Sequence, residues 1–469
     1  MTSVDRPLRK ETIMLSRRRA LQAGAAATVM GLAACDRGGE TPGAGGGQEQ
    51  HEFADAATGQ LATMGFNPSD EVGQSRADHA AAQLPDLQVS MDTANFDSQK
   101  FTAQAAAGQV PDLIQLDRSL VATFAANGLI MPLDQGFEVH GVDPATQYYE
   151  AALGDVTQAG AAYAVPQFFQ PSALLINVRT AEAAGIAPED FDTSVPDALL
   201  KVAEKGTSME GSAPTALGLD GDIPGSAEMW LQVFGGGSIG EDGAPTLDSS
   251  ENVDALTWMK ELMDLQGGYA EVTSLKNAMD VFGEQNQYVS DQVVAQSWAQ
   301  WYLNVLTDFA DGVDLHAVPI LGLDGAPIGF AGGSAFAVPA GAANPDGALA
   351  WALAATSTEA WLEAGKARAA TVAEGSGINT GLFTGSPEAD QQVREQYVEE
   401  SGDVDFDQSI SVYYDVLSAP RSTGPSPVGE QVKQALLDAV TAALNGEKEP
   451  AQALGDAQES AQREFDSAS

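Results

Sequence analysis

Residues 87–117, LQVSMDTANFDSQKFTAQAAAGQVPDLIQLD, read as a strand, a helix and a second strand in succession. LQVSM (87–91) and PDLIQLD (111–117) are short apolar runs typical of strands. FDSQKFTAQAAAG (96–108) has a helical pattern that ends at a glycine, the commonest helix stop signal. Because strands that alternate with helices form parallel βαβ units, this stretch predicts an α/β fold.

The same alternation continues on both sides of this stretch, with no internal repeat and no long linker after residue 50. Strands are predicted at 59–66, 173–178, 292–298, 313–321 and 334–340. Helices are predicted at 70–84, 250–268, 301–311, 344–357, 429–446 and 449–467. The last two helices, which have no strand after them, form a helical C-terminal end.

The composition excludes several classes of function. The formal net charge of the 469 residues is −44, with 22 Lys+Arg against 66 Asp+Glu, so the chain is a poor nucleic-acid binder. The acidic residues are scattered, which favours a hydrated, soluble surface over a site that attracts a cationic ligand. A single cysteine excludes an intramolecular disulfide and a cysteine cluster, and we expect no metal and no cofactor.

The first 34 residues differ from the rest and are predicted to be a signal peptide. They hold six basic residues (Arg6, Arg9, Lys10, Arg17, Arg18 and Arg19) followed by the weakly apolar ALQAGAAATVMGLAA. A basic start, a short apolar stretch and small residues at the end are typical of a secretory signal. SRRRAL (16–21) also resembles a twin-arginine export signal.

The signal ends in Leu32-Ala-Ala-Cys35, which resembles the lipobox of bacterial lipoproteins. In that family the chain is cut before the cysteine, and fatty-acyl chains such as palmitate are attached to it. The Gly-rich stretch DRGGETPGAGGGQEQ (36–50) that follows is typical of a flexible tether. We therefore expect residues 35–56 to anchor an exported protein, through Cys35, to the outer face of the cytoplasmic membrane.

Motifs for enzymatic chemistry lack the context that they need. GGSIG (236–240) matches the G-x-S-x-G pattern, but a loop follows it instead of a helix, so Ser238 is interpreted as a turn residue. The four histidines, His51, His79, His140 and His316, have no metal-binding spacing. Chance carboxylate pairs are certain among 66 acidic residues, and no local context singles one pair out.

The order of several segments resembles a known family. The segments are FTAQAAAGQVPDLIQLD, AAYAVPQFFQPSALLINVRTAEAAGI, QVVAQSWAQWYLNVL, AVPILGLDGAPIGFAGGSAFAVPAGAANPDGALAWALAATS and the C-terminal APRSTGPSPVGEQVKQALLDAVTAALNGEKEPAQALGDAQ. From about residue 57 to its end the chain resembles the family 1 extracellular solute-binding proteins of ABC importers, the maltose-binding-protein-like group. It departs from them at Ile176, where the family often has Tyr, and in lacking a Trp in TSVPDALL.

This resemblance implies an α/β, two-lobe periplasmic-binding-protein-like fold with an interlobe ligand cleft and a C-terminal helical cap. Lobe 1 is expected to comprise 57–165 and 317–365, and lobe 2 to comprise 166–316 and 366–469. The chain is expected to cross between the lobes near residues 165 and 317, and again after 365.

The resemblance also implies which residues bind the ligand. A sugar needs flat aromatic rings for its C–H faces and planar polar groups for its hydroxyls. The corresponding positions are Phe66, Asn67, Asp117, Phe168, Phe169, Trp230, Trp298, Trp301, Gly332, Gly333 and Arg421. Asp117 is also a suitable N-cap for a helix in DRSLVATF. Trp258, Trp351 and Trp361 lie inside predicted helices and are interpreted as core residues.

The sequence thus predicts a lipid-anchored, monomeric binding protein without enzymatic activity. It would capture a sugar or oligosaccharide and deliver it to an ABC permease. One alternative is the same fold with a polyamine or other cationic ligand, marked by several carboxylates in the cleft instead of tryptophan. Another is a secreted lipoprotein hydrolase, which the sequence does not support with a nucleophile, metal or carboxylate signature.

Overall fold

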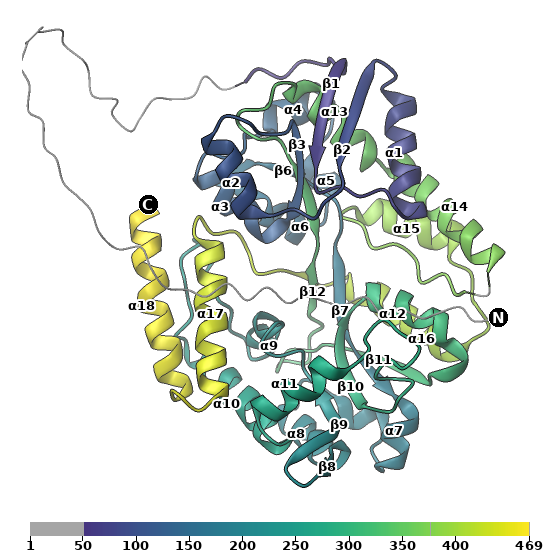
Figure 1. The fold of residues 1–469 in the computed structure, drawn as a ribbon, viewed down its shortest axis with the longest axis vertical. Helices are drawn as coiled ribbons and strands as arrows, with labels where there is room; N and C mark the ends of the chain where they lie inside the picture. Colours follow the sequence, from purple (N-terminus) through teal and green to yellow (C-terminus); the bar gives the residue numbers. More distant parts are fainter. Residues whose placement is uncertain (1–50, 376, 469) are drawn as a thin grey trace, which may run out of the picture. The chain divides into compact units, whose positions relative to one another are not determined.

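The computed structural model describes residues 51–375 and 377–468, whose strands form two large β-sheets and one small two-stranded sheet (Figure 1). The first sheet has the spatial order β2 (Leu87–Asp92), β1 (Gly59–Met64), β3 (Leu113–Asp117), β13 (Ser334–Ala337) and β6 (Ala164–Pro166). Strand β1 is parallel to β2 and β3, whereas β13 is antiparallel to β3 and β6. The sequence prediction of βαβ units at this end of the chain is confirmed.

The second sheet has the order β14 (Pro420–Arg421), β12 (Gly329–Gly332), β7 (Gln170–Asn177), β10 (Val293–Ala299), β9 (Ala213–Asp220) and β8 (Ser208–Glu210). Strand β7 pairs with β12 through Gln170 and Pro171, and with β11 (Leu315–Pro319) through residues 173–177. Strands β9 and β10 are parallel, and β7 runs antiparallel to β10. A separate two-stranded sheet joins β4 (Thr157–Gln158) to β5 (Ala161–Ala162).

Helices pack around each sheet, and we call each sheet with its helices a lobe. Lobe 1 has α1 (Glu71–Gln83), α2 (Ser98–Ala106), η1 (Arg118–Leu120), α3 (Val121–Ala126), α4 (Asp134–Val139), α5 (Pro144–Gln147), α6 (Glu150–Asp155), α13 (Pro345–Ala355), α14 (Thr358–Glu374) and α15 (Pro387–Tyr397). Lobe 2 has α7 (Val178–Ala183), η2 (Pro188–Phe191), α8 (Pro196–Gly206), α9 (Ala227–Val233), α10 (Ser250–Leu265), α11 (Tyr269–Ala278), α12 (Trp301–Leu306), η3 (Thr307–Gly312), α16 (Val404–Val416), α17 (Gly429–Leu444) and α18 (Pro450–Ala468). Figure 1 shows α17 and α18 side by side at the C-terminal end of the chain, as the sequence predicts.

Local sequence explains where these elements begin. The carboxylate of Asp70 accepts a hydrogen bond from the Gly73 amide at the start of α1. Asn344 caps α13 in the same way, and Pro345 occupies its first turn. Ser249 caps α10, which ends two residues before Gly267 because this glycine and Gly268 have positive φ angles of 105° and 92°.

Each lobe has its own apolar core. In lobe 1, Phe66 and Phe336 pack edge-to-face against Trp351. In lobe 2, Trp230 packs against Trp258 with ring centroids 4.7 Å apart. Trp258, Trp351 and Trp361 are all buried, which confirms their interpretation as core residues.

The chain passes between the lobes at three places. The first passage is the segment 167–169 between β6 and β7, and the second is Gly333 between β12 and β13. The third lies between α15, which packs on α14, and α16, which packs on β11. The second passage thus differs from the one expected near residue 317, because β11 and β12 pair with β7 of the second sheet. The expected boundary at residue 365 would divide α14, which packs along α1 over its length.

Within the described ranges, no helix combines the length and the apolar character needed to cross a bilayer. The same residues contain no group of three or more His, Cys, Asp and Glu side chains placed to hold a metal ion. Cys35 and the predicted signal peptide lie outside the described residues.

Candidate ligand-binding site

The passages between the lobes bring the ends of both sheets together. Asp117 at the carboxyl end of β3 pairs with Ser334 at the start of β13. Only Gly333 separates Ser334 from β12, whose Ala331 pairs with Pro171 of β7. In open α/β sheets ligands bind outside the carboxyl ends of the parallel strands, so this junction is the expected position of a site.

A cavity of about 280 Å³ lies at this junction and is lined by residues of both lobes. Lobe 1 contributes the turn after β3, and lobe 2 contributes the start of α9, one face of α17 and the segment 422–424. The polar and backbone groups of its wall include those of Asp117, Arg118, Ser119, Asp155, Ser226, Glu228, Ser238, Gly332, Gly333, Ser422, Thr423 and Lys433. Of the residues predicted to bind ligand, Asp117, Gly332 and Gly333 are therefore brought together.

Asp117 has two roles at the mouth of this cavity. Its exposed carboxylate lines the wall, and one oxygen accepts a hydrogen bond from the Ser119 amide at 2.9 Å. Both interpretations of this residue, as a cap and as a cavity residue, are consistent with its position.

Arg118 is a cavity residue that sequence reasoning missed. Its Nη2 donates to the carbonyl oxygen of Ala331 at 2.9 Å, and its Nη1 lies 3.3 Å from Oδ2 of Asp155. Its guanidinium also lies 4.8 Å from the ring centre of Phe169. Burial lowers the pKa of Arg118, although the negative charge of Asp155 opposes this shift. Burial also raises the pKa of Asp155.

Glu228 and Ser238 lie on the lobe 2 side of the cavity. The carboxylate of Glu228 accepts hydrogen bonds from the Ser238 amide at 3.2 and 3.3 Å and from Gln232 Nε2 at 3.2 Å. Burial raises the pKa of Glu228, although these hydrogen bonds oppose the shift. Ser238 lies in a bend after α9, so its surroundings lack the strand–turn–helix context of a nucleophile elbow.

Gly333 occupies a position that requires glycine. Its φ is 155°, and a Cβ atom there would lie 2.0 Å from the carbonyl oxygen of Phe168. The two neighbouring passages between the lobes therefore approach as closely as their backbones allow. A Cβ atom at Gly332 would meet no atom within 4 Å.

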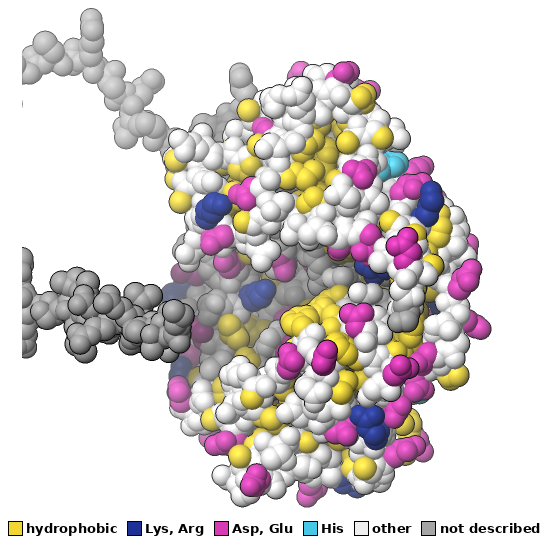
Figure 2. All heavy atoms as spheres, turned by 45° about the vertical axis from the view of Figure 1, so that its right-hand side comes forward, with side chains coloured by type: hydrophobic (Ala, Val, Ile, Leu, Met, Phe, Trp, Pro, Cys, Tyr) yellow, Lys and Arg dark blue, Asp and Glu magenta, His cyan; other side chains and the backbone are white. Residues whose placement is uncertain are grey.

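A second feature is an exposed aromatic surface made of Phe282 and Trp301, next to the half-buried Trp298. Trp298 lies near the carboxyl end of β10, and Trp301 begins α12. Phe282 is 67% exposed and stacks on the 36% exposed Trp301, with ring centroids 6.1 Å apart and planes inclined by 20°. Trp298 meets Trp301 edge-on and stacks on Tyr302, which is buried in the lobe 2 core. Figure 2 shows hydrophobic side chains gathered beside a hollow between the two lobes.

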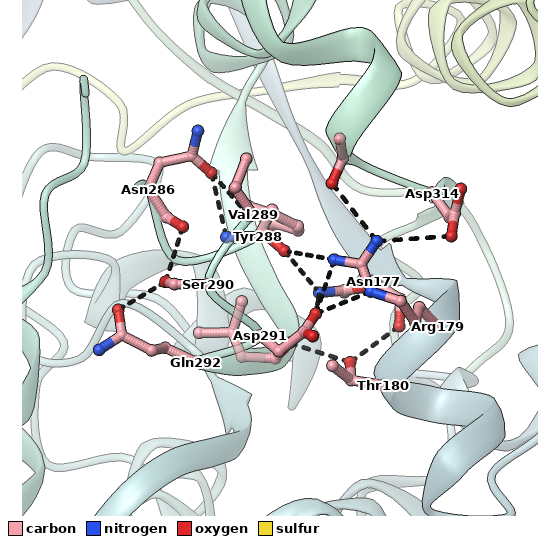
Figure 3. Close-up of polar contacts among 12 residues, drawn as sticks. Asn177, Arg179, Thr180, Asn286, Tyr288, Val289, Ser290, Asp291, Gln292 and Asp314 are labelled. Atoms are coloured by element: carbon pink, nitrogen blue, oxygen red, sulfur yellow. Dashed lines mark hydrogen bonds and ion pairs between the residues drawn. The ribbon is translucent and has the colours of Figure 1, made fainter. Parts of the chain in front are cut away.

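The loop that carries Phe282 is fixed at its other end by Arg179 of α7 (Figure 3). The guanidinium of Arg179 donates to Oδ1 of Asp291 at 2.7 and 3.0 Å and to the Tyr288 carbonyl at 3.1 Å. Asn177 Nδ2 donates to the same two acceptors. Asp291 has a positive φ of 57°, so these bonds hold a turn that is unfavourable for most residues just before β10.

Near the end of β9, two acidic side chains share one lysine. Lys276 Nζ lies 2.9 Å from Asp220 Oδ1 and 3.3 Å from Asp222 Oδ1. Gln296 Nε2 donates to the other oxygen of Asp220 at 2.7 Å. Burial lowers the pKa of Lys276, but the charges and hydrogen bonds of the two aspartates raise it further, so the pKa is raised overall.

The other predicted site residues lie elsewhere. Trp230 is fully buried, and its Nε1 donates to the Gly221 carbonyl at 2.8 Å. Phe66 and Phe169 are also buried in apolar clusters. Phe168 lines a shallow pocket beside the main cavity together with Asp117 and Gly333. Asn67 and Arg421 are exposed and lie outside the wall of the main cavity. Asn67 follows the buried Phe66, and Arg421 precedes Ser422, which lines the cavity.

Comparison with known proteins identifies the family. Residues 81–360, more than half of the chain, match the family model for the bacterial extracellular solute-binding proteins. The chain belongs to this family. These are exported binding components of ABC importers. No curated protein sequence matches the chain.

Many solved structures share the fold of this solute-binding protein. The Listeria monocytogenes ABC substrate-binding protein Lmo0181, in complex with cycloalternan, has a TM-score of 0.69 at 15% identity, over 87% of this chain and 99% of that one. CpMnBP1 with mannobiose bound has a TM-score of 0.67 at 20% identity, over 86% and 99%. UgpB from Mycobacterium tuberculosis, in complex with glycerophosphocholine, has a TM-score of 0.64 at 18% identity, over 87% and 99%. The likeness confirms the two-lobe fold. In these three proteins the fold binds ligands of different chemical classes, namely mannobiose, cycloalternan and glycerophosphocholine.

Proposed function

We propose that this solute-binding protein binds a sugar or oligosaccharide between two closing lobes and delivers it to a membrane permease. It catalyses no reaction in this proposal. The Phe282–Trp301 stack is the observation that carries the sugar assignment. Two large aromatic faces remain exposed on lobe 2, and Gln300, the residue before Trp301, donates a hydrogen bond to Thr380 of the segment between α14 and α15. Such faces match the apolar C–H faces of a pyranose ring.

The charges around the site also support a neutral ligand. Asp155 is paired with Arg118, Glu228 accepts two kinds of N–H donor, and Asp220 and Asp222 share Lys276. Asp117 keeps an exposed carboxylate at the cavity, suited to accept a hydrogen bond from a hydroxyl.

A polyamine or other cationic solute is the second candidate. The cavity wall contains the carboxylates of Asp117, Asp155 and Glu228, and no tryptophan. Aromatic faces also attract cations, so the Phe282–Trp301 stack is compatible with this ligand class. The ion pair of Asp155 with Arg118, and the hydrogen bonds that Glu228 already accepts from the protein, are the reason for preferring a neutral solute.

The ligand class is tested by thermal unfolding and titration calorimetry of the purified protein. The probes are glucose, maltotriose, mannobiose and mannotriose on one side, and putrescine, spermidine and choline on the other. Because a ligand that binds only the native state raises the melting temperature, a sugar should produce the shift. A shift produced by the amines alone overturns the sugar assignment.

We further propose that Cys35 carries the lipid that holds the exported chain on the outer face of the cytoplasmic membrane. The lipobox-like residues 32–35 and the Gly-rich stretch behind them support this proposal. The change Cys35→Ser should move the protein from the membrane fraction to the soluble fraction. Retention of the variant on the membrane contradicts the proposal. We also propose that the chain acts as a monomer.

A further inference from the structure

Three residues with amide side chains line the pocket that lies beside the main cavity. They are Asn95, Gln115 and Gln170, and we call this space, of about 330 Å³, the amide pocket. It shares Asp117 and Gly333 with the wall of the main cavity. Its volume lies in the range of small-molecule binding sites, so its chemistry bears on the ligand.

Asn95 is held at the pocket by the aromatic residue that follows it. Asn95 is exposed in the loop between β2 and α2 of lobe 1. The neighbouring Phe96 packs against Phe101 and Phe124, with ring centroids 5.6 and 6.0 Å apart. This packing anchors the loop in the lobe 1 core and leaves the amide of Asn95 at the surface of the pocket.

Gln115 is placed by the alternation of side chains along β3. Ile114 and Leu116 on either side of it are buried in an apolar cluster of lobe 1. Because successive side chains of a strand point to opposite faces, Gln115 shares the other face with Asp117. Gln115 is therefore a polar residue at the carboxyl end of a parallel strand, where ligands bind in open α/β sheets.

Gln170 comes from lobe 2 and joins the pocket to the aromatic surface. It is the first residue of β7 and pairs with Gly332 of β12. The carbonyl oxygen of the next residue, Pro171, accepts a hydrogen bond from the Gln300 amide at 2.9 Å. Since Gln300 directly precedes Trp301, the amide pocket adjoins the segment at which the exposed aromatic surface begins.

The three amide side chains keep their hydrogen-bonding capacity. Within residues 51–375 and 377–468, no hydrogen bond joins the side chain of Asn95, Gln115 or Gln170 to another group of the protein. An amide has one accepting oxygen and two N–H donors, so it can bond two neighbouring hydroxyls at once. Among the described residues that line the pocket, Asp117 alone is charged, so a cationic solute would find little compensation there.

We propose that the amide pocket holds one ring of the bound sugar, and that Asn95, Gln115 and Gln170 bind its hydroxyl groups. Phe168, in the same wall, supplies an aromatic ring for the C–H groups. The inference rests on the proposed sugar ligand and deepens it, because it assigns three binding residues that lie outside the main cavity and the exposed aromatic surface.

Titration calorimetry of variants with glucose, maltotriose, mannobiose and mannotriose tests the inference. Gln115→Met and Gln170→Met replace an amide by an apolar side chain of similar length, and Asn95→Ala removes the third amide. Each change should lower the affinity for the sugar that binds the native sequence by about tenfold or more, because hydroxyls lose their partners. The melting temperature without sugar should change little, since no hydrogen bond within the protein is lost.

Gln109→Met is the matched control, because Gln109 is exposed in lobe 1 and lies outside the amide pocket. It should leave the affinity unchanged, and an equal loss in this variant contradicts the inference. The inference is also wrong if fewer than two of the three pocket variants bind the sugar more weakly. If Gln115→Met does not fold, Asn95→Ala and Gln170→Met must both weaken binding.

The same titrations separate this inference from the proposed function. A sugar that binds the native sequence and all three pocket variants equally well overturns the amide pocket and leaves the sugar assignment standing. If none of the four sugars binds the native sequence, the sugar assignment fails, and the inference fails with it.

Discussion

The guanidinium of Arg118 lies 3.3 Å from the carboxylate of Asp155, and both side chains are almost completely buried where the lobes meet. Removal of one partner leaves the other charge without compensation in a poorly solvated position. We expect Asp155→Ala to lower the free energy of unfolding by about 3–5 kcal/mol, measured by urea denaturation.

The pair of Arg394 and Asp415 provides the control for this prediction. Its atoms lie 4.0 Å apart, and its side chains are 41% and 73% exposed. Asp415→Ala should cost no more than about 1 kcal/mol, because exposed ion pairs contribute little. Equal costs for the two substitutions contradict the importance that we assign to burial.

Asp390 predicts a dependence of stability on pH. It is buried, accepts hydrogen bonds from the Thr384 amide and the Tyr149 hydroxyl, and burial raises its pKa to about 8. Because the native state binds this proton more tightly than the unfolded chain, the stabilisation is complete below pH 4 and declines up to pH 8. The decline is at most about 1.4 kcal/mol per pH unit.

Chemical denaturation of the native sequence and of Asp390→Asn between pH 4.5 and 8.5 measures this contribution. The difference in unfolding free energy between the two proteins should change steadily across that interval, in favour of Asp390→Asn at high pH. A difference that is constant with pH shows that Asp390 is ionised throughout.

Gly333 and Gly332 form a matched pair of neighbouring glycines. Gly333→Ala places a Cβ atom against the Phe168 carbonyl in a backbone region that other residues rarely adopt, whereas Gly332→Ala adds a methyl group in open space. We expect Gly333→Ala to destabilise the protein by about 1–3 kcal/mol in thermal or urea unfolding. Gly332→Ala should stay within about 0.5 kcal/mol of the native sequence. An equal effect of the two changes argues against a tight passage between the lobes.

The exposed aromatic surface predicts an effect on affinity without an effect on folding. Phe282→Ala and Trp301→Ala remove rings that are substantially exposed, so the melting temperature should change little. The affinity for the sugar identified by titration should fall by about tenfold or more, equivalent to about 1.4 kcal/mol. Val404→Ala, at a position that is 79% exposed in lobe 2, is the control and should leave the affinity unchanged.

The fold could be predicted from the sequence because its signals are local. The apolar runs at 87–91 and 111–117, and the helix between them, match β2, β3 and α2 to within about two residues at each end. The sequence could not show that residues 317–332 belong to lobe 2 or that the whole of α14 belongs to lobe 1. Both assignments depend on strand pairing and helix packing between residues far apart in the sequence. Pairing of β11 and β12 with β7 depends on register that no local pattern contains.

The candidate site was harder to predict than the fold. Asp117, Gly332 and Gly333 follow strands whose ends meet, and the structure brings them together at the cavity. Trp230 carries the same type of side chain as Trp301, but it faces the core because α9 turns it toward Trp258. Phe282 lies in a loop without a periodic pattern, so only its exposure in the folded chain reveals it.

The position of β13 in the first sheet has a consequence for biosynthesis. This strand, residues 334–337, lies between β3 and β6, whose residues are made some 170 or more positions earlier in the chain. A nascent chain that has reached the end of β6 therefore lacks a central strand of its first sheet and cannot complete that core. Both lobes must therefore wait for the last third of translation before their cores can be completed.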